Sequence, residues 1–301
     1  MGELRVGIAL GSGSARGWAH IGVIRALADE GIKPDIICGS SIGALVGGAY
    51  AADQLDTLEE WVCNLSMWEV VRLMDIRLAG GLIEGHTLMA SINEHIQGVS
   101  IEELPRPYAA VATDLASGRE VWLQQGSLSD AIRASIALPG LFSPFRHDNR
   151  WLVDGGLTNP VPVSLCRAMG ADIIIAVNLN SDIVGRHITP RRDSEPEKEL
   201  LSQLMDRLNI NLGESSLSSF LSGKQQNAVP GMFEVIASTI NIMQDRITKS
   251  RMAGDPPDVV LSPRLAQLGL LEFDRAKDAI AEGRECVKRM LPAIRHACGT
   301  D

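Results

Sequence analysis

The first part of the chain alternates between short apolar runs, glycine-rich breaks and apolar residues at helical spacing. Leu4–Leu10 is mostly apolar and β-prone, and after a glycine loop apolar residues recur at helical spacing across Ile21–Leu27. Pro34–Cys38 repeats the apolar run and, after a second glycine loop, leads into the small-residue run Ala44–Ala52. Two strand–loop–helix units within about 50 residues predict a parallel sheet covered by helices.

Apolar runs further along the chain predict additional strands and helices. The expected strands are Tyr108–Thr113, Glu120–Leu123, Trp151–Val153, Ile173–Asn178 and Val259–Leu261. The expected helices are Thr57–Trp68, His86–Ile96, Leu128–Ala137 and Phe273–Met290. The sequence contains no internal repeat.

A polar stretch divides the chain. Residues 181–199 mix both signs of charge with prolines, which predicts a flexible connection after a core of residues 1–180. Residues 200–256 carry apolar stripes at helical spacing and predict a helical insertion, and residues 257–301 return to a strand and a last helix that close the core. The stripes fit a lid or a lipid-facing groove as well as ordinary core or a dimer surface, and the sequence leaves this open.

Composition excludes several classes of protein. Of 301 residues, 45% are hydrophobic and 22% are charged, which argues against general disorder. The net charge of −9 repels phosphate backbones and only 4% of residues are aromatic, so nucleic acid is not an expected partner. Five cysteines without a CxxC pair argue against a disulfide framework and a zinc site.

The sequence shows neither a leader pattern nor an apolar run long enough to span a membrane. With the cysteine pattern, this predicts a cytoplasmic protein whose contact with lipid, at the inner face of the membrane, is peripheral.

One motif combines a candidate nucleophile with the turn that would present it. Gly39-Ser40-Ser41-Ile42-Gly43 reads G-x-S-x-G, follows a predicted strand and precedes a predicted helix. This context is typical of a nucleophile elbow, in which a sharp turn exposes the serine and glycines relieve the crowding on both sides. Ser41 is therefore the candidate nucleophile. The alternative is a glycine–serine turn that only joins strand and helix.

A serine nucleophile needs a base, and the histidines are poorly placed for that role. His20 shares a helical face with apolar residues, which predicts a packed histidine, and His147 lies in a polar turn. His187 falls in the polar connection and His296 lies near the end of the sequence, and neither follows a strand. The missing histidine leaves a carboxylate as the candidate base.

Asp154 is the best-placed carboxylate. It ends the apolar run Trp151–Val153 and precedes Gly155 and Gly156, which predicts a side chain presented at the carboxyl edge of the sheet. An exposed aspartate with a pKa of about 3.9 is a weak base, so this role requires burial that raises its pKa. The alternative is an Asp-Gly turn that caps backbone amides. The catalytic interpretation requires Ser41 and Asp154 to meet at hydrogen-bonding distance.

The first glycine loop, Gly11–Gly17, has competing interpretations. It lacks the last glycine and the acidic ribose ligand of a dinucleotide fingerprint, and it lacks the ending of a P-loop. An oxyanion hole needs only backbone N–H groups at a helix N-terminus, each worth about 3–4 kcal/mol in the transition state. Arg16 fits either a lipid phosphate contact or a structural bond to loop carbonyls.

Taken together, these blocks resemble the patatin-like phospholipase family in order and spacing. The resemblance implies a three-layer α/β/α fold with a mainly parallel central sheet and a helical insertion before the last strand. It covers Arg5 to Asn180, and the closing segment resembles the bacterial branch related to neuropathy target esterase. The matching segments are Gly11–Gly17, Gly39–Gly43, Ala134–Gly140, Asp154–Gly156 and Pro257–Phe273.

The resemblance implies a Ser-Asp dyad that works without histidine. Ser41 is then the residue that accepts the acyl group and Asp154 its base, with amides around Ser12, Gly13 and Ser14 as the oxyanion hole. The family's usual loop is Gly-Gly-Gly, and here Ser12 and Ser14 replace its first and third glycines. A serine held at positive φ costs about 1 kcal/mol or more, so this departure bears on the level of activity more than on the type of reaction. The residues that support the motifs are Gly11, Arg16, Gly17, Gly39, Gly43, Gly155 and Gly156.

The expected function is a serine acyl hydrolase that cleaves carboxylic esters of lipids through an acyl-enzyme. No metal or cofactor is expected. The expected partner is a lipid or another acyl ester, and formation of a homo-oligomer is left open. The alternatives are a short-chain carboxylesterase with the same dyad, a non-catalytic regulator that binds a lipid or protein in the same cleft, and a nucleotide-binding protein that uses the first glycine loop.

Overall fold

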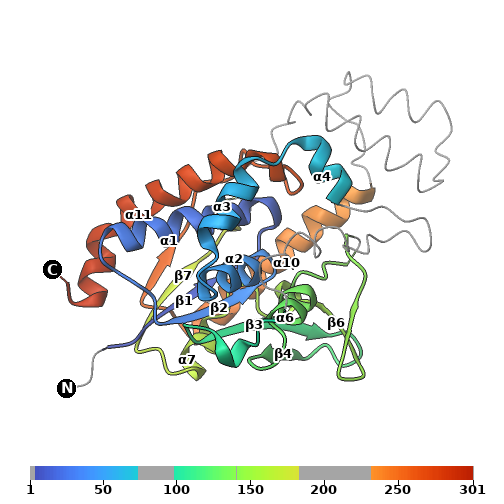
Figure 1. The fold of residues 1–301 in the computed structure, drawn as a ribbon, viewed down its shortest axis with the longest axis horizontal. Helices are drawn as coiled ribbons and strands as arrows, with labels where there is room; N and C mark the ends of the chain where they lie inside the picture. Colours follow the sequence, from blue (N-terminus) through green and yellow to red (C-terminus); the bar gives the residue numbers. More distant parts are fainter. Residues whose placement is uncertain (1–3, 74–97, 140, 183–231, 301) are drawn as a thin grey trace.

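A mixed sheet lies at the centre of the computed structural model, which describes residues 4–73, 98–139, 141–182 and 232–300 (Figure 1). Its strands run in the order β5-β6-β3-β2-β1-β7-β8, and β4 pairs with β3 outside this path. The ladders from β3 through β2, β1 and β7 to β8 are parallel, and those that join β4, β5 and β6 are antiparallel. The strands are β1 (Val6–Leu10), β2 (Ile36–Ser40), β3 (Tyr108–Asp114), β4 (Glu120–Leu123), β5 (Phe145–His147), β6 (Arg150–Asp154), β7 (Ile173–Val177) and β8 (Val259–Leu261).

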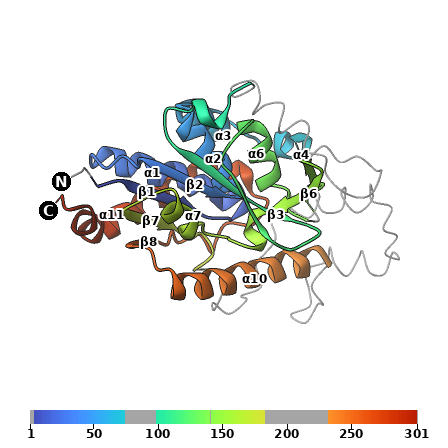
Figure 2. The ribbon, with the colours of Figure 1, turned by 90° about the horizontal axis from the view of Figure 1, so that it is seen from below.

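Helices cover both faces of this sheet. Figure 2 shows α10 along one side of the sheet and α2, α3 and α6 on the other. The helices are α1 (Ala19–Asp29), α2 (Ile42–Ala51), α3 (Leu55–Cys63), α4 (Met67–Leu73), α6 (Leu128–Ser135), α7 (Val163–Ala168), α10 (Met232–Gly254) and α11 (Ala276–Cys298). Short 3-10 turns are η1 (Ser14–Trp18), η2 (Ile101–Glu103), η3 (Gly155–Leu157) and η4 (Phe273–Arg275). The expected α/β class with a mainly parallel sheet is confirmed.

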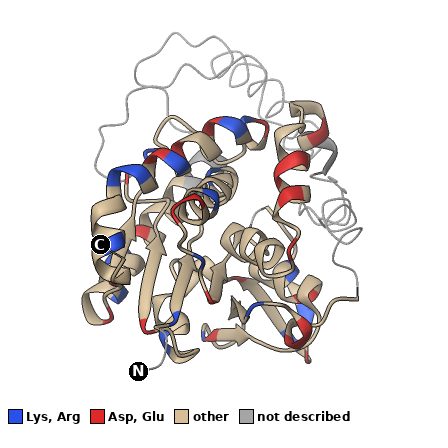
Figure 3. Cartoon of the chain, turned by 60° about the vertical axis from the view of Figure 1, so that its left-hand side comes forward, with Lys and Arg blue, Asp and Glu red and all other residues tan. Residues whose placement is uncertain are grey.

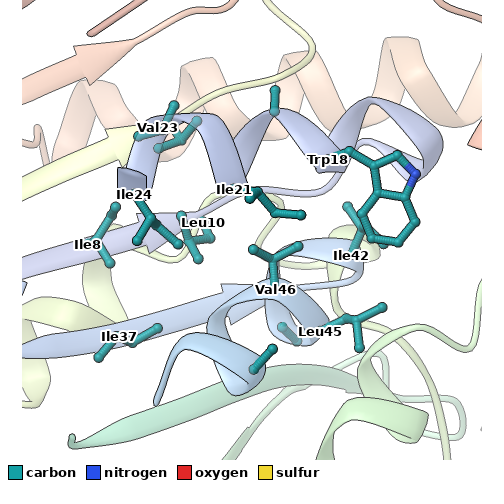
Figure 4. Packing of buried hydrophobic residues seen from close by; sticks show 14 of the residues in the cluster. Ile8, Leu10, Trp18, Ile21, Val23, Ile24, Ile37, Ile42, Leu45 and Val46 are labelled. Atoms are coloured by element: carbon teal, nitrogen blue, oxygen red, sulfur yellow. The ribbon is translucent and has the colours of Figure 1, made fainter. Parts of the chain in front are cut away.

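Successive strand residues supply two separate hydrophobic clusters, because side chains alternate between the faces of a sheet. Ile8 and Leu10 pack with α1, α2, α6 and α11 in the larger cluster. Figure 4 shows part of it between the first two strands and their helices. Ala9 and Cys38 belong to the smaller cluster on the other face, with α7 and with Met252 of α10. Three layers therefore follow from strands that are apolar on both faces.

Strand β3 brings the ends of two other strands together. β2 pairs with the first part of β3 as far as Ser40 opposite Val111, and β6 pairs with the last part, with Asp154 opposite Ala112. β4 pairs with the middle of β3 and overlaps both of these parts, so it occupies the opposite edge of β3. β2 and β6 therefore share one edge of β3 and lie end to end along it. The residue after Ser40 is Ser41, so the register places Ser41 beside Asp154.

Two local differences from the expected elements have clear causes. The helix expected over Thr57–Trp68 is two helices, α3 and α4, because Ser66 and Glu69 form a capping box that starts the second one. The polar turn around His147 joins the unpredicted strand β5 to β6, and its central residues Asp148 and Asn149 both have positive φ, as two-residue hairpins require. The helix expected at 86–96, residues 183–199 of the expected connection and residues 200–231 of the expected insertion lie outside the described residues.

Charged residues lie mainly on the outer helices, and the central strands contain few of them (Figure 3). Two ion pairs join α11 to the C-terminal end of α1 and the residue after it, Arg284 with Asp29 and Arg295 with Glu30. Within the described ranges, none of the helices is long and apolar enough to cross a membrane.

Candidate active site

The turn between β2 and α2 holds Ser41 in a strained conformation. Ser41 has φ 56° and ψ −127°, a region that residues with a side chain seldom adopt. A Cβ on Gly39 would lie 2.4 Å from the Gly43 carbonyl oxygen, and one on Gly43 would lie 2.1 Å from the Leu10 carbonyl oxygen. Glycine is therefore required at both positions, and the turn has the form of a nucleophile elbow.

The hydroxyl of Ser41 meets the carboxylate of Asp154. Ser41 Oγ donates a hydrogen bond of 2.5 Å to Asp154 Oδ2, and the N–H of Gly156 donates one of 2.7 Å to Oδ1. Asp154 is fully buried. The two side chains that the sequence analysis singled out are thus brought together, and each carboxylate oxygen has a fixed donor.

Burial raises the pKa of Asp154 from its ordinary 3.8 to about 7. The hydrogen bonds from Ser41 and Gly156 favour the charged form and lower the pKa, but by less than burial raises it. A carboxylate with a pKa near neutrality accepts a proton from a hydroxyl far better than an exposed aspartate does. The environment therefore supplies the basicity that a dyad without histidine requires.

Ser135, which the sequence analysis did not single out, supports the elbow from α6. Its Oγ accepts a hydrogen bond of 2.9 Å from the N–H of Ser41 and donates one of 2.6 Å to the Val111 carbonyl. The side chain is fully buried and joins the elbow to β3, the strand that also aligns Asp154. In the sequence, the only indication of this role is that Ser135 is a polar residue within the segment Ala134–Gly140 that matches the family.

The glycine loop after β1 presents two amides, fewer than expected. The N–H of Ser12 donates to the Pro160 carbonyl at 2.8 Å, so this amide is already engaged. Among the described residues, the N–H groups of Gly13 and Ser14 donate to no backbone acceptor, unlike those of Gly11, Ser12, Ala15 and Arg16. Ser14 has φ 52°, the costly conformation foreseen for this loop, and its Oγ donates a hydrogen bond of 2.6 Å to the Leu270 carbonyl.

His20 and Arg16 hold this loop in place. His20 is buried, as expected of a packed histidine, and burial lowers its pKa to about 4. The ring is therefore neutral, and Nε2 donates to the Gly11 carbonyl at 2.8 Å. Arg16 is buried too and donates to Asn241 Oδ1 of α10 at 3.2 Å, so its side chain bonds to a neighbouring helix instead of to loop carbonyls.

The other candidates add no ligand cluster. His147 ends β5 and His296 lies in the last part of α11, whereas His187 is outside the described residues. No group of three or more histidine, cysteine, aspartate or glutamate side chains in the described part of the chain is arranged to hold a metal ion. All five cysteines are free.

Comparison with known sequences defines the family. The family model described as "Patatin-like phospholipase" matches residues 8–167. An uncharacterised NTE family protein of Mycobacterium tuberculosis is 36% identical over 335 residues, which cover 96% of this chain and 92% of the relative. The chain therefore belongs to the patatin-like phospholipase family, and the resemblance inferred from the motifs is confirmed.

More distant relatives share parts of the chain. Human patatin-like phospholipase domain-containing protein 6 is 34% identical over 184 residues, which cover 58% of this chain and 13% of that protein. The crystal structure of VipD from Legionella pneumophila matches with a TM-score of 0.48 and 12% identity, and covers 97% of this chain and 67% of that one. The family assignment rests on the sequence matches.

Proposed function

We propose that the protein is a serine acyl hydrolase that cleaves carboxylic ester bonds of lipids with Ser41 and Asp154. Membership of the family supports a lipid hydrolase. The observation that carries the finer proposal is the 2.5 Å hydrogen bond between a serine in a strained elbow and a buried carboxylate of raised pKa. Perturbed titrating groups that contact a candidate nucleophile are typical of catalytic sites.

In the proposed reaction these groups act in sequence. Ser41 Oγ attacks the ester carbonyl carbon while its proton passes to Asp154 Oδ2. The free N–H groups of Gly13 and Ser14 stabilise the oxyanion of the tetrahedral intermediate. Asp154 then gives the proton to the departing alcohol, which leaves an acyl-enzyme on Ser41. Water hydrolyses the acyl-enzyme by the same steps, with Asp154 as the base.

A lipid ester is the substrate class that the family favours, and we expect contact with membranes to be peripheral. The second candidate is a carboxylesterase for short soluble esters, since the dyad itself does not depend on acyl length. The two differ in one measurement. We expect a higher kcat/KM on dispersed lysophospholipid than on p-nitrophenyl butyrate, and the reverse order would favour the second candidate.

The direct test compares hydrolysis by the wild type with that by two variants. Ser41→Ala should abolish turnover, and Asp154→Asn should lower kcat at least about a hundredfold, the scale of general-base losses. Ser250→Ala, at an exposed position of α10, serves as the matched control and should keep wild-type turnover. Undiminished hydrolysis by Ser41→Ala would overturn the proposal.

A further inference from the structure

Helix α10 buries polar side chains and exposes apolar ones. Gln244 is only 4% exposed, and Asp245 and Thr248 are buried as well. Ile242 and Met243 beside them are exposed, Met243 by 45%. Burying polar groups costs free energy unless they find partners, so this inverted pattern indicates a specific use for the polar face.

The polar face lies against the segment that follows Asp154. The Arg251 guanidinium anchors α10 there: it donates to the Thr158 carbonyl at 3.3 Å, to Ser164 Oγ at 3.0 Å and to the Glu120 carboxylate at 2.9 Å. These contacts hold α10 beside η3, the turn that contains Gly156. The helix is thus a fixed wall of the site.

One hydrogen-bond chain sets the orientation of the Gln244 amide. Asn180 Nδ2 lies 3.5 Å from the Ser12 carbonyl and donates to Gln244 Oε1 at 3.0 Å. A carbonyl accepts only from a donor, so Asn180 must turn its Nδ2 toward Ser12. Gln244 must then turn Oε1 toward Asn180, which leaves its Nε2 on the side of the dyad.

The Nε2 group faces a notch in front of Gly156. A Cβ built on Gly156 would lie 2.5 Å from Gln244 Nε2, 2.5 Å from Ser12 Oγ and 2.9 Å from Asp154 Oδ1. These three polar atoms therefore surround one small space that any side chain at residue 156 would fill.

We propose that Gln244 is a positioning residue for the Ser41–Asp154 dyad, held by Asn180 so that its N–H donor faces the Asp154 carboxylate from α10. The inference rests on the proposed function. An N–H dipole directed at a carboxylate favours its charged form and disfavours rotation away from Ser41. Gln244 thus acts through Asp154, by keeping its carboxylate oriented toward Ser41.

No charged side chain is among the causes of the raised pKa of Asp154. Burial, Ser41 and Gly156 are the causes of its pKa shift. A new charge at residue 244 should therefore add a coulombic effect on Asp154 that the wild type lacks. Among the described residues, the buried or partly buried charged side chains on the elements around it are Arg16 on η1, Asp114 on β3, Asp130 and Arg133 on α6, and Asp245 and Arg251 on α10. The exposed Lys249 pairs with Asp245.

The experiment compares two variants with a control on the same helix. Gln244→Met keeps the length of the side chain but removes the donor, and it should lower kcat about tenfold while KM stays within about twofold, as for a group that acts in the transition state. Gln244→Glu places a like charge near Asp154 and should raise the pKa of the acidic limb of kcat/KM by about one pH unit or more. Met243→Glu adds the same charge at an exposed site and should leave both unchanged.

A second measurement needs no substrate. The difference in unfolding free energy between proteins with Asp154 and with Asp154→Asn, followed across pH, reports the titration of Asp154 in the folded state. In the Gln244→Glu background this titration should move to higher pH. An unmoved titration would overturn the role of Gln244. A wild type that cleaves no ester would overturn the proposed function alone.

Discussion

Replacement of Asp154 by asparagine should stabilise the protein at alkaline pH. The side chain is fully buried, and its pKa rises from 3.8 to about 7 on folding. A carboxyl group with a raised pKa binds its proton more tightly in the folded state than in the unfolded state. Its contribution to stability is therefore complete below pH 3.8 and is lost as the pH rises through about 7.

The size of this loss follows from the shift. About three pH units correspond to about 4 kcal/mol of unfolding free energy between strongly acidic and alkaline solution. Asparagine has the same shape, can still accept from Gly156 through Oδ1 and carries no charge to bury. At pH 8.5 the variant should therefore retain the unfolding free energy that the wild type loses when Asp154 becomes charged.

Urea denaturation at pH 4 and pH 8.5 measures the effect. The unfolding free energy of Asp154→Asn minus that of the wild type should increase by about 4 kcal/mol between the two conditions. Asp148→Asn, which removes a carboxylate whose side chain is 78% exposed, is the control and should show little change. Parallel pH profiles for the wild type and Asp154→Asn would refute the raised pKa and with it the explanation of the base.

Three further predictions concern the same site. The kcat/KM for ester hydrolysis should rise about tenfold per pH unit below pH 7 and level off above it, because Asp154 must be deprotonated to act; a flat profile from pH 5 to 8 would contradict this. Ser135→Ala should cost about 1–3 kcal/mol in urea denaturation and reduce turnover, since the Ser41 N–H loses its buried acceptor; an unchanged stability would count against that role. Gly43→Ala should lower stability by about 1–3 kcal/mol and abolish turnover, because its Cβ meets the Leu10 carbonyl; wild-type thermal stability and turnover would show that the elbow tolerates a side chain.

The elbow and the carboxylate could be predicted because their signals are local. A glycine on each side of Ser41 is a steric requirement of the turn, and it is written in adjacent residues. Asp154 could be selected because an apolar run ended at it and the histidines offered no better base. That the two meet depends on the shared edge of β3, which the sequence does not reveal.

The supporting residues escaped the sequence analysis because their roles depend on tertiary contacts. Ser135 is one polar residue in an amphipathic helix, and nothing near it in the sequence shows that it will face the Ser41 amide. The apolar stripes of residues 200–256 left open whether their side chains pack or face outward, and they gave no sign that in α10 Gln244 is buried while Met243 is exposed. Hydrophobic periodicity assumes an apolar interior, and it fails where a helix packs against a polar site.

The amide of Ser12 shows a similar limit. Its position in the loop suggested an oxyanion donor, but the Pro160 carbonyl, far away in the sequence, already accepts from it. Backbone groups of a loop can be assigned only when all their long-range partners are known.

Reaction with a fluorophosphonate, followed by mass spectrometry of the intact protein and its peptides, tests the nucleophile most directly. The wild type should gain a single phosphonyl group, located on Ser41, and Ser41→Ala should gain none. A phosphonyl group on another residue, or full labelling of Ser41→Ala, would contradict the assignment of the dyad.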